Sequence, residues 1–204
     1  MSSAAAPHAT PHPATSHSTT LGVDNYKLAM WTFLGSECFF FGSLIGTYMS
    51  YRGKSLTGPY PLDVFDPSVT SLSTFDLLAS SLFMVFAVHY AKAGDIKRTL
   101  GWLGATMLGG LIFLGFQYYE FSHFVHEGLT LKSNLFGATF YVLTGFHGTH
   151  VAVGVLLLGS VGWAAARGHL ANVGETTEVI GLYWHFVDVV WIVIFTLVYL
   201  LEYT

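Results

Sequence analysis

The stretch that decides the fold is Leu28–Tyr51, LAMWTFLGSECFFFGSLIGTYMSY, an apolar run that holds a single carboxylate, Glu37. As a helix that rises about 1.5 Å per residue, it is about 36 Å long and can cross a hydrocarbon core of about 30 Å. Glu37 then lies about 14 Å inside, near the middle of the membrane. A charge at that depth costs at least a few kcal/mol, so we expect Glu37 to be protonated, paired, or turned toward a protein or water-lined interior.

The predicted helix has two different faces. At about 100° per residue, Phe41 and Tyr48 lie on the side of Glu37, whereas Gly42 and Gly46 lie opposite. The two glycines have the GxxxG spacing that lets another helix approach the backbone closely. Glu37 could simply be hydrogen-bonded to a neighbouring helix, but we favour a functional role, because a titratable group usually stays buried only where it is used.

Composition places the whole chain in a membrane. Of the 204 residues, 52% are apolar and 10% are charged, against about 25% charged in soluble proteins. The 22 glycines and 16% aromatic residues suit helix contacts and membrane interfaces. A net charge of −4 does not indicate nucleic-acid binding. Cys38 is the only cysteine, so the chain can form no internal disulfide and no CxxC metal site.

The predicted fold is an all-α bundle of five transmembrane helices within a domain at residues 25–204. Residues 1–24, rich in Ser, Thr, Pro and His, are predicted to be a disordered tail. We see no internal repeat, which argues against an inverted-repeat transporter. With the N-terminus inside, five Lys and Arg residues lie inside and three outside, so we predict a cytoplasmic N-terminus and an outer C-terminus. The predicted spans are 28–51, 72–91, 100–121, 135–165 and 179–203.

Several ionisable residues are predicted to share one depth in the membrane, in its inner half or its middle. Three interpretations of this layer compete: a metal or haem site, a proton or ion path, and a structural polar layer that fixes helix packing. The residues alone favour the structural layer, because Gly145 and Gly148 beside two of the histidines indicate close helix packing. The layer consists of Glu37, His89, His147, His150, His185 and Asp188.

Sequence motifs along the chain identify a family resemblance. They are SECFFFG around Glu37, the Gly94–Asp95 turn, YYE at Tyr118–Glu120, GFHGTH at Gly145–His150 and YWHFVDVVW at Tyr183–Trp191. With these motifs the chain resembles subunit III of the haem-copper cytochrome c oxidases, from the first span to Tyr203.

The resemblance implies a non-redox subunit that packs on the catalytic subunit I, binds phospholipid and supports proton uptake and turnover stability during oxygen reduction coupled to proton translocation. It implies that this chain binds no haem, copper or other metal and that partner subunits hold the haem and copper. Glu37 matches the buried carboxylate that reacts with carbodiimide in the family. The implied partners are subunits I and II and membrane lipids, with a cytochrome bc complex as a further candidate; no nucleic acid is expected.

The chain departs from the usual family pattern in two ways. The usual form has seven spans, and this chain begins at the third. His89 is followed by Tyr90 where two adjacent histidines are common. The five-span form resembles bacterial subunits, actinobacterial ones especially, which places the chain in a bacterial plasma membrane. The alternative is an autonomous membrane haem or metal oxidoreductase, or a proton or ion transporter, that uses the layer of Glu37, the histidines at 147, 150 and 185, and Asp188.

Overall fold

The computed structural model describes residues 25–55 and 67–203. Within these ranges all regular structure is helical, and five helices are long and apolar enough to cross a membrane, which confirms the predicted fold class. The predicted N-terminal tail and most of the loop after the first span lie outside the described residues. The five helices are α1 (Asn25–Tyr51), α3 (Pro67–Lys92), α4 (Ile96–His126), α5 (Leu135–Ala166) and α6 (Val173–Ile194).

Most of the helices extend beyond the predicted apolar spans, and polar side chains cap the N-terminal ends of α4, α5 and α6. α4 continues to His126, well past the apolar stretch. α6 begins at Val173, where the Asn172 side chain accepts a hydrogen bond from the Glu175 N–H at 3.1 Å. After α6 the chain continues as a π-helical turn at Phe195–Tyr199 and a 3-10 turn at Leu200–Tyr203.

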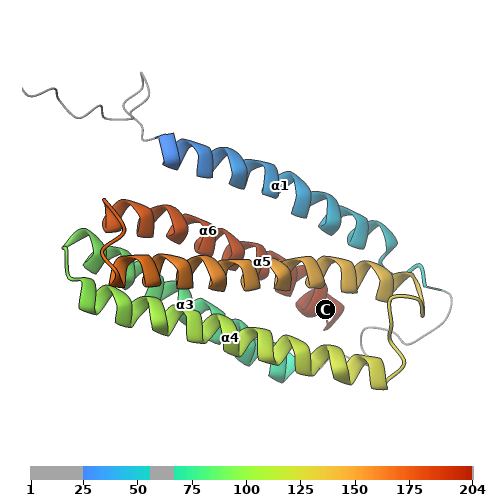
Figure 1. The fold of residues 1–204 in the computed structure, drawn as a ribbon. Helices are drawn as coiled ribbons and strands as arrows, with labels where there is room; N and C mark the ends of the chain where they lie inside the picture. The colour runs from blue at the N-terminus through green and yellow to red at the C-terminus, as the bar shows by residue number, and fades with distance from the viewer. Residues whose placement is uncertain (1–24, 56–66, 204) are drawn as a thin grey trace, which may run out of the picture.

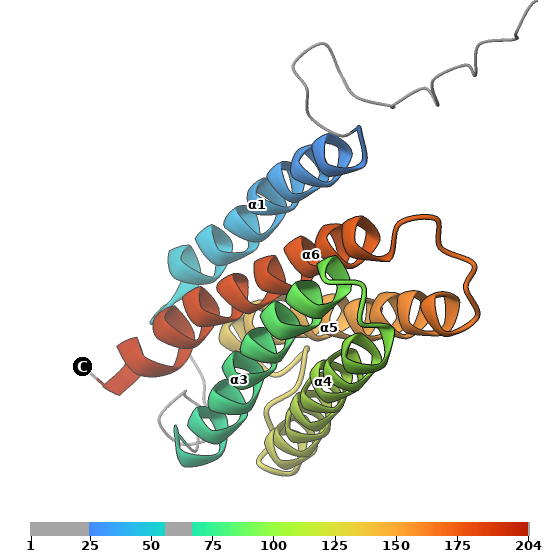
Figure 2. The same ribbon diagram turned by 90° about the vertical axis from the view of Figure 1, so that its left-hand side faces the viewer.

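Four helices form a ring and α1 lies outside it. α3 packs against α4 and α6, and α5 packs against the same two helices, which closes the ring. α1 runs along α5 and α6 and has its main contacts with these two (Figures 1 and 2). One long edge of α1 is therefore attached to the bundle, and most of its surface faces away.

The turn between α3 and α4 shows how short connections fix the ring. Gly94 has φ +78°, a left-handed conformation that suits glycine at the end of a helix. Asp95 follows at once, and its carboxylate accepts a hydrogen bond from the Arg98 N–H at 3.0 Å, which starts α4. This tight connection makes α3 and α4 antiparallel neighbours.

Trp184 of α6 is the centre of the ring. It is fully buried, and its indole N–H donates to the Ser80 hydroxyl of α3 at 3.1 Å. Gly110 of α4 and Gly154 of α5 make room for the indole. A Cβ would lie 2.5 Å from the indole at Gly110 and 2.8 Å from it at Gly154. All four helices of the ring thus meet at one side chain, which couples the packing of each to the others.

Candidate functional site

The structure pairs Glu37 of α1 with His150 of α5. Glu37 Oε2 lies 3.2 Å from His150 Nε2, and their side chains are 17% and 18% exposed. His150 Nδ1 lies 2.7 Å from the Phe146 carbonyl oxygen, which can only accept a hydrogen bond, so Nδ1 carries a hydrogen. The contact at Nε2 then needs one proton, either on the imidazole or on the carboxyl group. The pair therefore shares one proton and is neutral as a unit.

The Glu37–His150 pair has an aromatic side and an open side. The Phe41 ring lies 4.9 Å from the His150 ring, between centroids, and covers it edge-on. The Tyr183 hydroxyl donates to the His150 carbonyl oxygen at 3.0 Å, which ties α6 to this part of α5. Beside the pair is a small hollow of about 200 Å³ among α1, α5 and α6. Its lining residues are mostly apolar: Met30, Phe33, Thr149, His150, Val153, Leu157 and Tyr183.

His147, one turn before His150, lies in an aromatic cage inside the ring. It is fully buried and stacks on Trp191 with 4.8 Å between ring centroids, while the Phe113 ring meets it edge-on at 5.6 Å. Neither of its ring nitrogens has a hydrogen-bond partner within residues 25–55 and 67–203. These contacts are those of a packing residue between α4, α5 and α6.

His185 and Asp188 face a different neighbour, α3. His185 Nδ1 lies 2.7 Å from the Ser81 hydroxyl oxygen. Asp188 is 3% exposed, and the Ser81 side chain of α3 is close enough to interact with its carboxyl group. Both residues therefore belong to the interface of α3 with α6 and not to the Glu37–His150 pair.

The structure divides the six residues of the predicted polar layer among separate places. Glu37 and His150 are paired, whereas His89 is exposed near the end of α3, where its ring meets that of Tyr90 at 5.2 Å. Residue counts along a helix predict the depth of a side chain in the membrane. They do not predict which neighbour it meets, because that depends on the direction of the side chain around the helix axis. The six side chains therefore meet different neighbours within the described residues, and their shared depth in the membrane stays a prediction.

The four glycines predicted to pack helices differ in what they meet. Gly148 lies against the Gln117 side chain of α4, which leaves no room for a Cβ. Gln117 in turn donates to the Thr144 carbonyl oxygen at 2.7 Å. Close helix packing at Gly42, Gly46 and Gly145 stays a prediction, since no described residue comes within 4 Å of the place a Cβ would take there.

The described part of the chain offers no metal site. No three of its His, Cys, Asp and Glu side chains are grouped so that they could hold a metal ion. The side chains that the sequence suggested as ligands are split between the Glu37–His150 pair, the aromatic cage of His147 and the contact of His185 with α3. Within residues 25–55 and 67–203, these side chains therefore form no group of three that could hold a metal ion.

The sequence did not predict the contacts of two acidic residues, Glu178 and Glu120. Glu178 of α6 binds Lys27 of α1 at 2.8 Å and Lys92 of α3 at 3.0 Å. Glu120 of α4 is buried and accepts a hydrogen bond from the Thr70 hydroxyl of α3. The available signal for Glu178 was its place near a helix end on the side of the membrane predicted for Lys27 and Lys92. The two lysines entered only the prediction of orientation, and Glu178 did not enter it.

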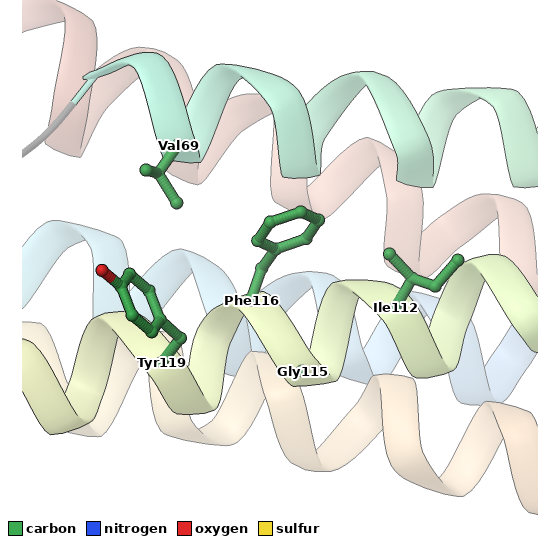
Figure 3. Close-up of a pocket in the computed structure, with 5 residues that line it drawn as sticks. All are labelled: Val69, Ile112, Gly115, Phe116 and Tyr119. Atoms are coloured by element: carbon green, nitrogen blue, oxygen red, sulfur yellow. The ribbon is translucent and has the colours of Figure 1, made fainter.

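A second hollow lies on the surface of the ring, between α3 and α4. It is shallow and almost entirely apolar, and Figure 3 shows Phe116 pointing from α4 toward α3 across it. It contains no titratable group apart from one tyrosine, so it offers a packing surface and no chemistry. Its lining residues are Val69, Ile112, Gly115, Phe116 and Tyr119.

Comparisons with known proteins agree with the motifs. A family model described as cytochrome c oxidase subunit III matches residues 12–203. The cytochrome c oxidase subunit 3 of Bacillus sp. (strain PS3) is 41% identical over 189 residues, which cover 92% of this chain and 91% of that protein. The subunit 3 of the Bacillus subtilis (strain 168) cytochrome c oxidase is 40% identical over 191 residues, with 93% and 92% covered. A quinol oxidase subunit 3 of the same strain is 38% identical over 175 residues, with 85% and 86% covered. The chain therefore belongs to the cytochrome c oxidase subunit III family.

Proposed function

We propose that this chain is the non-redox subunit of a respiratory haem-copper oxidase, which packs on catalytic subunit I beside subunit II and supports proton uptake and turnover stability. Membership of the family places it in an oxidoreductase complex, as a multi-pass protein of a bacterial plasma membrane. Haem and copper belong to the partner subunits in this proposal, because the side chains described here form no ligand set. Both cytochrome c and quinol oxidase subunits are among its relatives, so the proposal names no electron donor.

The Glu37–His150 pair is the observation that carries the proposed support of proton uptake. Two groups that can each bind a proton, Glu37 on the apolar helix α1 and His150 on α5, lie 3.2 Å apart and share one proton. Because the pair is neutral as a unit, it avoids the cost of an isolated charge in the membrane. Its second ring nitrogen is fixed on the Phe146 carbonyl oxygen, so proton exchange involves Nε2 and the carboxyl group.

The apolar hollow beside the pair supports phospholipid as a ligand. It opens between α1 and the ring and is lined mainly by aliphatic and aromatic side chains, which suit an acyl chain. An acyl chain there would exclude water from the open side of His150. We propose that lipid completes the surroundings of the pair on the side that protein leaves uncovered.

Replacing Glu37 in the assembled oxidase tests the proposal. In Glu37→Gln and Glu37→Ala we expect haem content and initial oxygen consumption to be kept, while proton uptake falls and the enzyme loses activity after fewer turnovers. Ser43→Ala is the matched control, since Ser43 is exposed on the same helix and its hydroxyl donates to the Phe40 carbonyl oxygen of that helix. Normal proton uptake and turnover lifetime in both Glu37 variants would refute the proposed role, and loss of haem would assign Glu37 to assembly instead.

A further inference from the structure

α1 is attached to the bundle by a narrow seam. All 27 of its residues are described, and three of them are buried. The seam has the heptad spacing of a coiled coil, in which two positions of every seven face the neighbour. One series is Lys27, Leu34, Phe41 and Tyr48, and the other is Met30, Glu37 and Leu44. Lys27 and Glu37 are thus the one amine and the one carboxylic acid on the surface that α1 turns toward the ring.

Apolar contacts alone hold such a seam weakly in a membrane. Lipid tails solvate an apolar side chain about as well as a neighbouring helix does, so helix association depends on close packing and polar links. The structure gives α1 polar links near both ends. At its C-terminal end the Arg52 guanidinium donates to the Leu201 carbonyl oxygen at 2.7 Å. At its N-terminal end Lys27 binds Glu178.

Glu178 joins three helices at the N-terminal end of α1. Lys27 and Lys92 both bind its Oε2 atom, at 2.8 Å and 3.0 Å, so the two ammonium groups lie within about 6 Å of each other. The Lys27 and Lys92 ammonium groups would repel each other, but the Glu178 carboxylate between them attracts both and so links α1 to α3. Removing its charge would therefore both free the end of α1 and push it away from α3.

We propose that Glu178 is a positioning residue for Glu37. By holding Lys27 next to Lys92, it fixes the rotation and the distance of α1 relative to the ring, which keeps the Glu37 carboxyl group against His150 and away from the lipid. Lys27 and Glu37 are ten residues apart on one continuous helix, about 15 Å along its axis, so a rotation of the helix that moves Lys27 also moves Glu37. The inference extends the proposed function, but the position of Glu37 can be measured without reference to activity.

The test is the rate at which a lipophilic carbodiimide modifies Glu37 in the purified oxidase complex in lipid nanodiscs, followed by mass spectrometry of the modified peptide. In Glu178→Gln we expect the rate to rise about three- to tenfold, because Glu37 spends more time facing lipid. Glu178→Asp should restore much of the wild-type rate. The matched control is Glu175→Gln, since Glu175 lies on the same helix and binds only its own N-cap residue, Asn172, among the contacts that the structure gives it.

Two further variants separate positioning from general damage. Lys27→Gln breaks the link to α1 and should raise the labelling rate as Glu178→Gln does. Lys92→Gln leaves the 2.8 Å pair of Lys27 with Glu178 in place and should label at nearly the wild-type rate. Wild-type labelling in Glu178→Gln and Lys27→Gln, or equal increases in all variants including Glu175→Gln, would overturn the inference. Faster labelling with unchanged proton uptake would keep the inference and refute the proposed role of Glu37.

Discussion

Adding one methyl group at Gly110 is expected to destabilise the whole ring. In Gly110→Ala the Cβ would lie 2.5 Å from the Trp184 ring and 2.8 Å from a Val155 methyl carbon. Neither neighbour is free to move, since Trp184 is fully buried and bonded to Ser80, and Val155 is 7% exposed. Overpacking of this kind costs about 1–3 kcal/mol. At about 1.4 kcal/mol per factor of ten, the unfolding equilibrium constant should rise about 5- to 150-fold.

The assay is reversible unfolding in mixed micelles with increasing SDS, followed by tryptophan fluorescence. The matched control is Gly104→Ala on the same helix, where no described residue lies within 4 Å of the added carbon. The control should leave the free energy of unfolding unchanged or raise it by up to about 1 kcal/mol, since alanine favours a helix more than glycine does. Equal unfolding curves for Gly110→Ala and Gly104→Ala would refute the conclusion that Trp184 fills a closed space between the helices.

Two serine variants test the polar contacts of α3 with α6. Ser80→Ala removes the acceptor of the Trp184 indole N–H and should cost about 0.6–2 kcal/mol in the same unfolding assay. Ser81→Ala removes the partner of His185 and should destabilise by a similar amount while leaving the haem spectrum of the assembled oxidase unchanged. A neutral Ser80→Ala, or a changed haem spectrum in Ser81→Ala, would contradict these assignments.

The fold could be predicted from sequence, because hydropathy alone separates five apolar spans from their polar connections. The ends of the helices could not, since polar residues outside the hydrocarbon core continue a helix as well as apolar ones do. Ile96–His126 is the clearest case, because its last turn carries histidines and no apolar run. The closing of a ring around Trp184 also had no sequence signal, since glycines are common throughout the chain.

The candidate site was predicted in part. Glu37 stands out in the sequence because a carboxylate inside an apolar run requires an explanation. Its partner was harder to predict, since His147 and His150 are both histidines three residues apart, and only the packing of α1 decides which one faces Glu37. Glu178 was missed because charges near helix ends are expected in any membrane protein, and their pairing depends on how the helices are arranged.

Isolation of the oxidase through a tag on this chain tests the central claim most directly, which is that the chain supports a redox enzyme and carries no redox centre. Purified in mild detergent from its own membrane, the tagged chain should bring haem-bearing and copper-bearing subunits with it. After these partners are stripped away, it should show no haem absorption and no bound copper. Stable haem or copper that remains with the chain alone, or a tagged chain that brings no oxidase subunits, would contradict the account.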